Sequence, residues 1–128
     1  MNILLVEDDP IDRKLLAAVL KSSGHRVLEK STAEQAAKEI KHRQPEVVVL
    51  DLKLPGIDGL ELARRLRADA DTRHIRIVAI TAARESYSQD AALAAGCDAF
   101  IVKPVDTRTL SDQIVNVVIA QPHQPEPE

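Results

Sequence analysis

The sequence of 128 residues predicts an α/β fold built on a parallel sheet, and two patterns support this prediction. Short apolar runs alternate with amphipathic helical segments five times along the chain. Most of these runs are continuous rather than alternating, which is typical of strands that helices bury on both faces. The intervening segments are long enough to return each strand parallel to the one before it. We expect strands at residues 2–6, 26–30, 46–50, 75–80 and 99–102.

The run at residues 26–30 differs from the other four because it carries Arg26, Glu29 and Lys30. A strand inside a parallel sheet has helices on both faces and little room for charged side chains. We therefore expect this strand to lie at an edge of the sheet.

Capping residues define the starts of the first two helices. Asp9-Pro10 opens the first helix, with the acid as N-cap and the proline at the first helical position, and Ser23-Gly24 ends it. Ser31 or Thr32 precedes the second helix. Each of these two residues has a Glu or Gln three positions later, so a capping box forms in either register.

Similar signals delimit the other three helices. Asp58 is expected to cap the third helix. The fourth is expected near residues 85–95 and ends at Gly96, and the fifth begins after Asp106 or Thr107.

The composition indicates one globular domain, with 45% hydrophobic and 29% charged residues. A net charge of −3 argues against a nucleic-acid-binding surface, and only two aromatic residues are present to stack on bases. We expect no signal peptide, and no apolar run approaches the ~20 residues that a membrane span needs. The single cysteine fits a reducing compartment. We expect a cytoplasmic protein that binds neither nucleic acid nor membranes.

Polar residues follow four of the five predicted strands at the points where those strands end. The carboxyl ends of parallel strands lie at one edge of the sheet, where ligands bind in folds of this class. We therefore expect one cluster of polar side chains, which contains Glu7, Asp8, Asp9, Asp51, Thr81 and Lys103.

Carboxylates from two strands in one small space repel each other unless a cation lies between them. An oxygen-only ligand set favours Mg²⁺, with Mn²⁺ as a substitute, over zinc. Lys103 can neutralise part of the charge, and Thr81 can hydrogen-bond a further oxygen. The cluster predicts a metal-assisted phosphoryl-acceptor site in which an aspartate is the nucleophile.

Four motifs occur in order, each at the end of a predicted strand. They are Ile-Leu-Leu-Val-Glu-Asp-Asp at 3–9, Val-Val-Val-Leu-Asp-Leu-Lys-Leu-Pro-Gly-Ile-Asp-Gly at 47–59, Ile-Thr-Ala at 80–82 and Phe-Ile-Val-Lys-Pro at 100–104. Together they resemble the receiver domains of two-component response regulators, over residues 2–119. The resemblance implies a flavodoxin-like (βα)5 fold, a doubly wound five-stranded parallel sheet with strand order 2-1-3-4-5.

The resemblance also implies a role for each residue at the site. Asp51 would accept a phosphoryl group from a histidine kinase or a histidine phosphotransfer protein. Asp8 would bind Mg²⁺ directly, Glu7 would hold it through water, and the backbone carbonyl of Lys53 would complete the ligands from the protein. Lys103 would contact the phosphoryl oxygens.

Two further residues would act as the switch of such a domain. Thr81 would move toward the phosphoryl group, and Phe100 would turn inward as it does so. The Lys103-Pro104 bond is expected to be cis, as is usual in the family. Lys53 and Ala83 lie two residues after the acceptor and the threonine, and they predict slow self-hydrolysis of the phosphorylated form.

Other polar residues have simpler explanations. We interpret Asp9 and Asp58 as helix caps and Cys97 as a buried, unreactive thiol. Two larger sets are expected on the surface: His25, His42, His74 and His123, and the arginines Arg64, Arg65, Arg67, Arg73 and Arg76.

The resemblance predicts a phosphorylation-driven switch at residues 1–120. Residues 121–128 hold three prolines and no apolar side chain, so we expect them to form a disordered Pro/Glu tail. We expect the chain to stand alone with no output domain, and to bind a downstream protein through its fourth helix, fifth strand and fifth helix. It would be a monomer or a phosphorylation-dependent dimer. We expect it to catalyse no reaction other than its own phosphorylation and dephosphorylation. An adaptor with a vestigial site is the alternative. A phosphatase of the haloacid-dehalogenase type is disfavoured, because it needs a second aspartate two residues after its nucleophile and this chain has Lys53 there. A flavodoxin is disfavoured, because the acids after the first strand would repel the phosphate of its cofactor.

Overall fold

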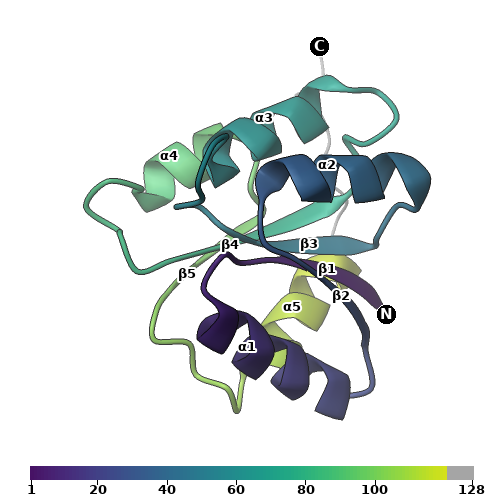
Figure 1. The fold of residues 1–128 in the computed structure, drawn as a ribbon, viewed down its shortest axis with the longest axis vertical. Coiled ribbons are helices and arrows are strands. Elements are labelled where there is room, and N and C mark those ends of the chain that lie inside the picture. Colours follow the sequence, from purple (N-terminus) through teal and green to yellow (C-terminus); the bar gives the residue numbers. More distant parts are fainter. Residues whose placement is uncertain (121–128) are drawn as a thin grey trace.

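The computed structural model describes residues 1–120, which form one five-stranded parallel sheet in the order β2-β1-β3-β4-β5 (Figure 1). This order confirms the predicted flavodoxin-like topology, and it places the polar strand β2 at an edge as expected. The proposed tail at 121–128 lies outside the described residues. The strands are β1 (Asn2–Val6), β2 (Arg26–Lys30), β3 (Val47–Asp51), β4 (Arg76–Thr81) and β5 (Ala99–Val102).

Helices cover both faces of the sheet. In Figure 1, α1 and α5 lie below the sheet, and α2, α3 and α4 lie above it. None of the helices within residues 1–120 is long and apolar enough to span a bilayer. Their bounds are α1 (Pro10–Ser22), α2 (Ala33–His42), α3 (Gly59–Ala68), α4 (Gln89–Ala94) and α5 (Leu110–Ile119).

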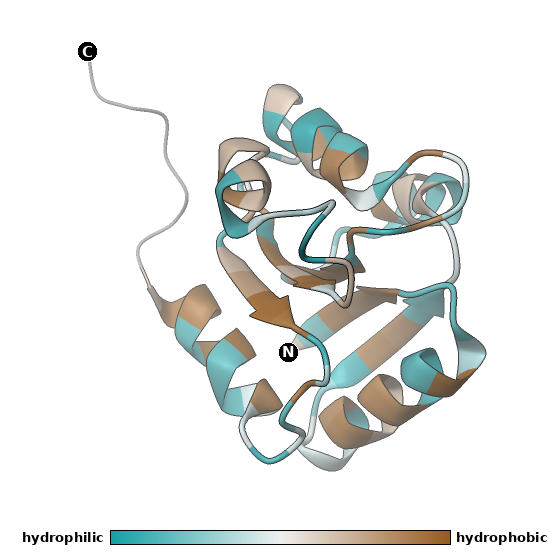
Figure 2. Cartoon of the chain, turned by 90° about the vertical axis from the view of Figure 1, so that its left-hand side faces the viewer, coloured by the Kyte–Doolittle hydropathy of each residue, from teal (hydrophilic) through white to brown (hydrophobic). Residues whose placement is uncertain are grey.

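Two aliphatic clusters form the core, one on each face of the sheet. Successive side chains of a strand point to opposite faces, so Leu4 and Val6 join the cluster under α2 and α3, while Ile3 and Leu5 join the one under α1 and α5. Figure 2 shows mostly hydrophobic strands between helices of mixed colour. Burial on both faces is what the continuous apolar runs of β1, β3 and β4 predict.

The predicted caps of the first three helices are confirmed. Asp9 accepts hydrogen bonds from the N–H groups of Ile11 and Asp12 at 2.8 and 3.3 Å. Thr32, rather than Ser31, caps α2, and the side chain of Asp58 caps α3.

The fourth and fifth helices begin later than the sequence predicts. α4 starts at Gln89 and is capped by Ser88, because a turn at Ala83 precedes it. The predicted start of α5 after Asp106 or Thr107 is wrong, since α5 begins at Leu110. The Asp106 carboxylate accepts the backbone N–H of Arg108 at 3.0 Å, which forms a local turn in place of a helix cap.

The expectation of five solvated arginines is wrong for Arg67. Its guanidinium donates hydrogen bonds to the carbonyls of Gly96, Arg73 and Ile75 and forms a 2.7 Å ion pair with Asp98. Gly96 has φ +105°, and a Cβ there would lie 2.3 Å from the Arg67 side chain. The side chain of Arg67 is only 10% exposed, and its hydrogen bonds to backbone carbonyls and to Asp98 stabilise the enclosed charge.

Arg76 is also buried, because it reaches across to the end of α5. Its guanidinium donates to the carbonyls of Val117 and Ala120 at 3.4 and 3.3 Å. Last-turn carbonyls of a helix have no partner within the helix, so a cation there is favourable. His25 likewise departs from the surface prediction, since it is half-buried and its Nε2 lies 2.8 Å from Ser111 Oγ. His123 lies outside the described residues.

Candidate functional site

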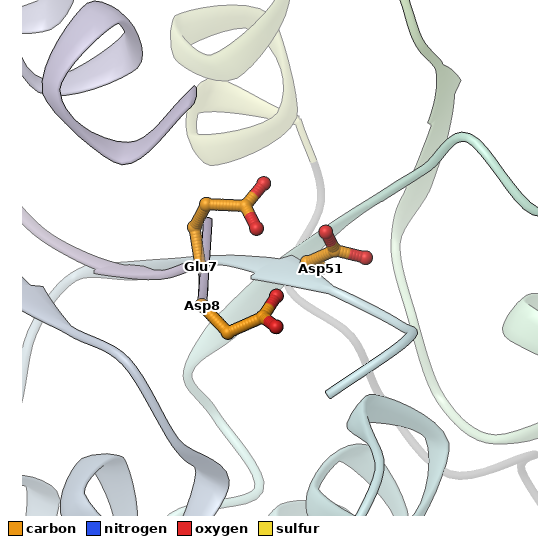
Figure 3. Close-up of side chains that lie close together, drawn as sticks. All are labelled: Glu7, Asp8 and Asp51. Atoms are coloured by element: carbon orange, nitrogen blue, oxygen red, sulfur yellow. The ribbon is translucent and has the colours of Figure 1, made fainter. Parts of the chain in front are cut away.

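The sheet brings three carboxylates together at its carboxyl edge. Glu7 and Asp8 directly follow β1, and Asp51 is the last residue of the neighbouring strand β3. One oxygen from each of the three lies within 4.8 Å of the other two. Figure 3 shows these side chains next to one another at the ends of their strands. The clustering predicted from the strand ends is therefore present.

Glu7 and Asp51 are buried, with 1% and 7% of their surfaces exposed, whereas Asp8 is exposed. Glu7 accepts the backbone N–H of Asp9 at 3.1 Å. Burial raises the pKa of Glu7 to about 7 and the charge of Asp51 adds to this, although Lys103 opposes the shift. The site thus holds negative charge that is costly to keep out of water.

Lys103 supplies the positive charge of the cluster. It follows β5, and its bond to Pro104 is cis, as expected. Its Nζ hydrogen-bonds Glu7, Asp51 at 2.9 Å and Asp12 at 3.2 Å. Burial alone would lower the pKa of Lys103, but the hydrogen bonds to Glu7 and Asp51 outweigh burial and raise it. Lys103 therefore stays charged at neutral pH.

The loop after β3 orients Asp51. The second carboxylate oxygen, Oδ1, accepts the backbone N–H of Lys53 at 3.0 Å. Gly59 lets α3 approach closely, since a Cβ there would lie 2.6 Å from the Asp51 carbonyl oxygen. A cavity of about 670 Å³ lies over the cluster, and Lys53 and Ala83 are among the residues that line it. The Asp51 carboxylate therefore borders a space large enough for a phosphoryl group.

The two predicted switch residues lie on neighbouring strands, Thr81 at the end of β4 and Phe100 on β5. Thr81 ends β4 and is fully buried, and its hydroxyl accepts the N–H of Ala83 at 2.9 Å. Ala83, rather than Thr81, is among the residues that line the cavity. Phe100 is half-buried and, like Tyr87, packs against the core cluster under α2 and α3. Their switch roles stay predictions.

Two residues of α1 belong to the site and were not predicted. Arg13 donates to the carbonyl of Glu7 at 3.0 Å and to that of Asp8 at 3.4 Å, so it fixes the backbone of the acid pair. Asp12 contacts Lys103. A usable signal was present: α1 starts directly after the acid pair, so the polar side chains of its first turn lie near the site.

The structural roles predicted for three other residues are confirmed. Asp9 and Asp58 cap helices, and Asp58 also accepts the hydroxyl of Tyr87 at 3.4 Å. Cys97 is buried, and burial raises the pKa of its thiol to about 12, which makes it a poor nucleophile.

A parallel sheet with an acid pair, a buried aspartate and a lysine at its carboxyl edge defines a phosphoryl-acceptor domain of the two-component type. The comparisons agree with this class. The family model described as "Response regulator receiver domain" matches residues 3–115. The chain belongs to this family, whose members act in two-component systems and bind Mg²⁺ at an acidic pocket.

Similar proteins include both long and short relatives. Transcriptional regulatory protein AfsQ1 from Streptomyces coelicolor is 37% identical over 113 residues, which are 88% of this chain and 49% of that protein. The chain thus spans about half the length of that relative. The polar-differentiation response regulator DivK from Brucella ovis is 28% identical over 81% of this chain and 85% of its own.

Solved structures show the same fold. A putative response regulator from Chloroflexus aurantiacus has a TM-score of 0.86 at 29% identity and covers 91% of this chain and 97% of its own. The receiver domain of a sensor histidine kinase from Pseudomonas aeruginosa, solved with a magnesium ion coordinated in its active-site cleft, has a TM-score of 0.83 at 29% identity. Coverage there is 91% of this chain and 95% of that one.

Proposed function

We propose that this chain is a single-domain response regulator that accepts a phosphoryl group on Asp51 and thereby changes its binding to a downstream protein. One observation carries the proposal. The buried carboxylate of Asp51 lies 2.9 Å from the Lys103 ammonium, beside Glu7 and Asp8, and borders an open cavity. A buried acid next to further acids costs stability, and chemistry at the site explains its presence.

The donor set suits Mg²⁺, with Mn²⁺ as a substitute. Carboxylates of Glu7, Asp8 and Asp51 would hold the ion, and the carbonyl of Lys53 would complete the set. The related Pseudomonas aeruginosa domain, described with magnesium in its active-site cleft, supports this assignment. When bound, the ion would neutralise charge on the acids and the phosphoryl oxygens.

The chain's own residues would then carry out an in-line transfer. An Asp51 oxygen attacks the phosphorus of a phosphohistidine, the P–N bond breaks, and its electron pair leaves with the imidazole nitrogen. The backbone N–H of Lys53 orients the carboxylate through Oδ1, and the Lys103 ammonium binds the transferring oxygens. The donor would be a histidine kinase or a histidine phosphotransfer protein.

The signal would leave the site through β4 and β5. Thr81 would exchange its bond to Ala83 for one to the phosphoryl group, and Phe100 would turn inward behind it. Thr81 pairs with Val102 in the sheet, two residues after Phe100, which supports a path to the face formed by α4, β5 and α5. Leu93 of α4 is 47% exposed and suits a protein contact there.

Several narrower statements belong to the same proposal. The reactions of the chain are limited to its own phosphorylation and dephosphorylation, and it acts in the cytoplasm as a monomer or a phosphorylation-dependent dimer. Lys53 and Ala83 border the cavity, and neither of these two side chains is an acid or amide that could orient water, so self-hydrolysis is slow. Loss of the phosphoryl group within seconds in magnesium buffer would contradict this last point.

Intact-mass measurement with acetyl phosphate tests the central proposal. With Mg²⁺, the wild type should gain the mass of one phosphoryl group, and it should gain none after chelation of the metal. Asp51→Asn should gain none under either condition. An unmodified wild type would refute phosphoryl acceptance and favour the vestigial adaptor, whose partner binding would be the same for Asp51→Asn.

A further inference from the structure

The ammonium of Lys103 contacts a third carboxylate that the acceptor site does not require. Asp12, in the first turn of α1, places its Oδ2 3.2 Å from Lys103 Nζ. It is not among the three acids whose oxygens cluster within 4.8 Å of one another. Asp12 thus approaches Lys103 from the helix, separately from the acids at the ends of β1 and β3.

A lysine ammonium has three N–H donors and no more. In this structure the three partners are Glu7, Asp51 and Asp12, so every donor of Lys103 is occupied by a carboxylate. A phosphoryl oxygen that arrives at Asp51 can therefore hydrogen-bond Lys103 only if one carboxylate gives up its donor.

The burial of the three acids decides which of them gives way. The side chains of Glu7 and Asp51 are 2% and 8% exposed, and a buried carboxylate without its cation is strongly unfavourable. The side chain of Asp12 is 41% exposed, so water can replace Lys103 around it at little cost. Asp12 is the partner that is cheapest to release.

We propose that Asp12 is a positioning residue that competes with the phosphoryl group for Lys103. It holds the third donor of the ammonium on the α1 side of the cavity until a phosphoryl oxygen displaces it. The inference rests on the proposed phosphoryl acceptance at Asp51. Its consequence is that Asp12 weakens the binding of phosphoryl groups and so sets the concentration of donor that the domain needs.

Beryllofluoride with Mg²⁺, a noncovalent mimic of a phosphoryl group, provides a direct test by ¹⁹F NMR titration. Asp12→Asn should bind it about two- to fivefold more tightly than the wild type, because a neutral amide competes less well for the ammonium. In phosphorylation kinetics with acetyl phosphate, the apparent KM should fall by a similar factor while the maximal rate stays unchanged. Asp12→Glu, which restores the charge, should return both values toward the wild type.

Asp9→Asn is the matched control. It removes the same charge from a residue that lines the same cavity but does not contact Lys103, and asparagine remains a good N-cap. Its effect should be less than half that of Asp12→Asn. An equal effect would mean that only the net charge matters, and unchanged or weaker binding by Asp12→Asn would also overturn the proposal.

Failure of the inference is distinguishable from failure of the proposed function. A wild type that binds no beryllofluoride and gains no phosphoryl mass refutes acceptance at Asp51 itself. A wild type that does both, with an Asp12→Asn variant that behaves identically, refutes only the role of Asp12. Thermal unfolding of each variant verifies that the fold is intact.

Discussion

Each edge of the sheet holds a largely enclosed cation, and the charges around this cation differ between the two edges. At the carboxyl edge Lys103 faces three carboxylates, so negative charge is in excess. At the amino edge Arg67 faces one carboxylate, Asp98, and its other partners are backbone carbonyls. The carboxyl edge therefore keeps negative charge that a further cation can neutralise, whereas at the amino edge the charge of Asp98 neutralises that of Arg67. An uncompensated buried charge therefore marks the functional edge, and a compensated one the structural edge.

The largest expected effect on stability is at the balanced edge. Arg67→Ala should lower the free energy of unfolding by about 3 kcal/mol, because it removes the ion pair with Asp98 and the hydrogen bonds to several backbone carbonyls. Urea unfolding followed by circular dichroism measures the change. Arg64→Ala, which removes an exposed partner of Glu61, is the control and should cost less than about 0.5 kcal/mol. Similar losses in the two variants would contradict the structural role of Arg67.

Neutralising one acid at each edge should change stability in opposite directions. In the absence of Mg²⁺, Asp51→Asn should raise the free energy of unfolding by about 1 kcal/mol, because it relieves repulsion with Glu7. Asp98→Asn should lower it by about 2 kcal/mol, because it weakens the 2.7 Å ion pair with Arg67. The same unfolding experiment compares the two variants. The contrast between the edges fails if both changes have the same sign.

The sequence was informative wherever a local pattern reflected the final environment. Continuous apolar runs predict strands covered on both faces, and the meeting of strand ends predicts the cluster of Glu7, Asp8 and Asp51. Charged residues that are satisfied by distant backbone were not predictable in this way. The carbonyl of Gly96 is a partner of Arg67 from 29 residues away, and no motif encodes that contact.

The start of α5 and the role of Asp12 in α1 were also not predictable from local sequence. The start of α5 depends on whether the Asp106 carboxylate caps the helix or closes a turn with Arg108, and both uses suit an aspartate. In the sequence, Asp12 is simply an acid in the first turn of a helix, where a negative charge is favourable, and the structure confirms this position. Only the folded structure brings Lys103 from the opposite end of the chain to meet it.

Magnesium should stabilise the protein through the carboxyl edge alone. At a free Mg²⁺ concentration about tenfold above its Kd, the wild type should gain about 1.4 kcal/mol, because the ion binds only the folded state. Arg67→Ala should gain the same increment from its lower baseline, and Asp51→Asn should gain much less. Thermal unfolding with and without the ion measures these gains. A reduced gain in Arg67→Ala would show that the two edges are coupled.

The smallest effect is expected at Cys97, which also lies near Arg67. The guanidinium favours the thiolate, but burial is the larger influence and raises the pKa of this thiol to about 12. Cys97→Ala should therefore leave phosphorylation unchanged and lower the free energy of unfolding by about 1 kcal/mol or less, since it removes only a small buried group. In the folded wild type, iodoacetamide at pH 8 should modify this thiol far more slowly than in urea. Rapid labelling of the folded protein would show that the amino edge is more open and reactive than its balanced contacts indicate, and the two edges would then differ in charge but not in accessibility.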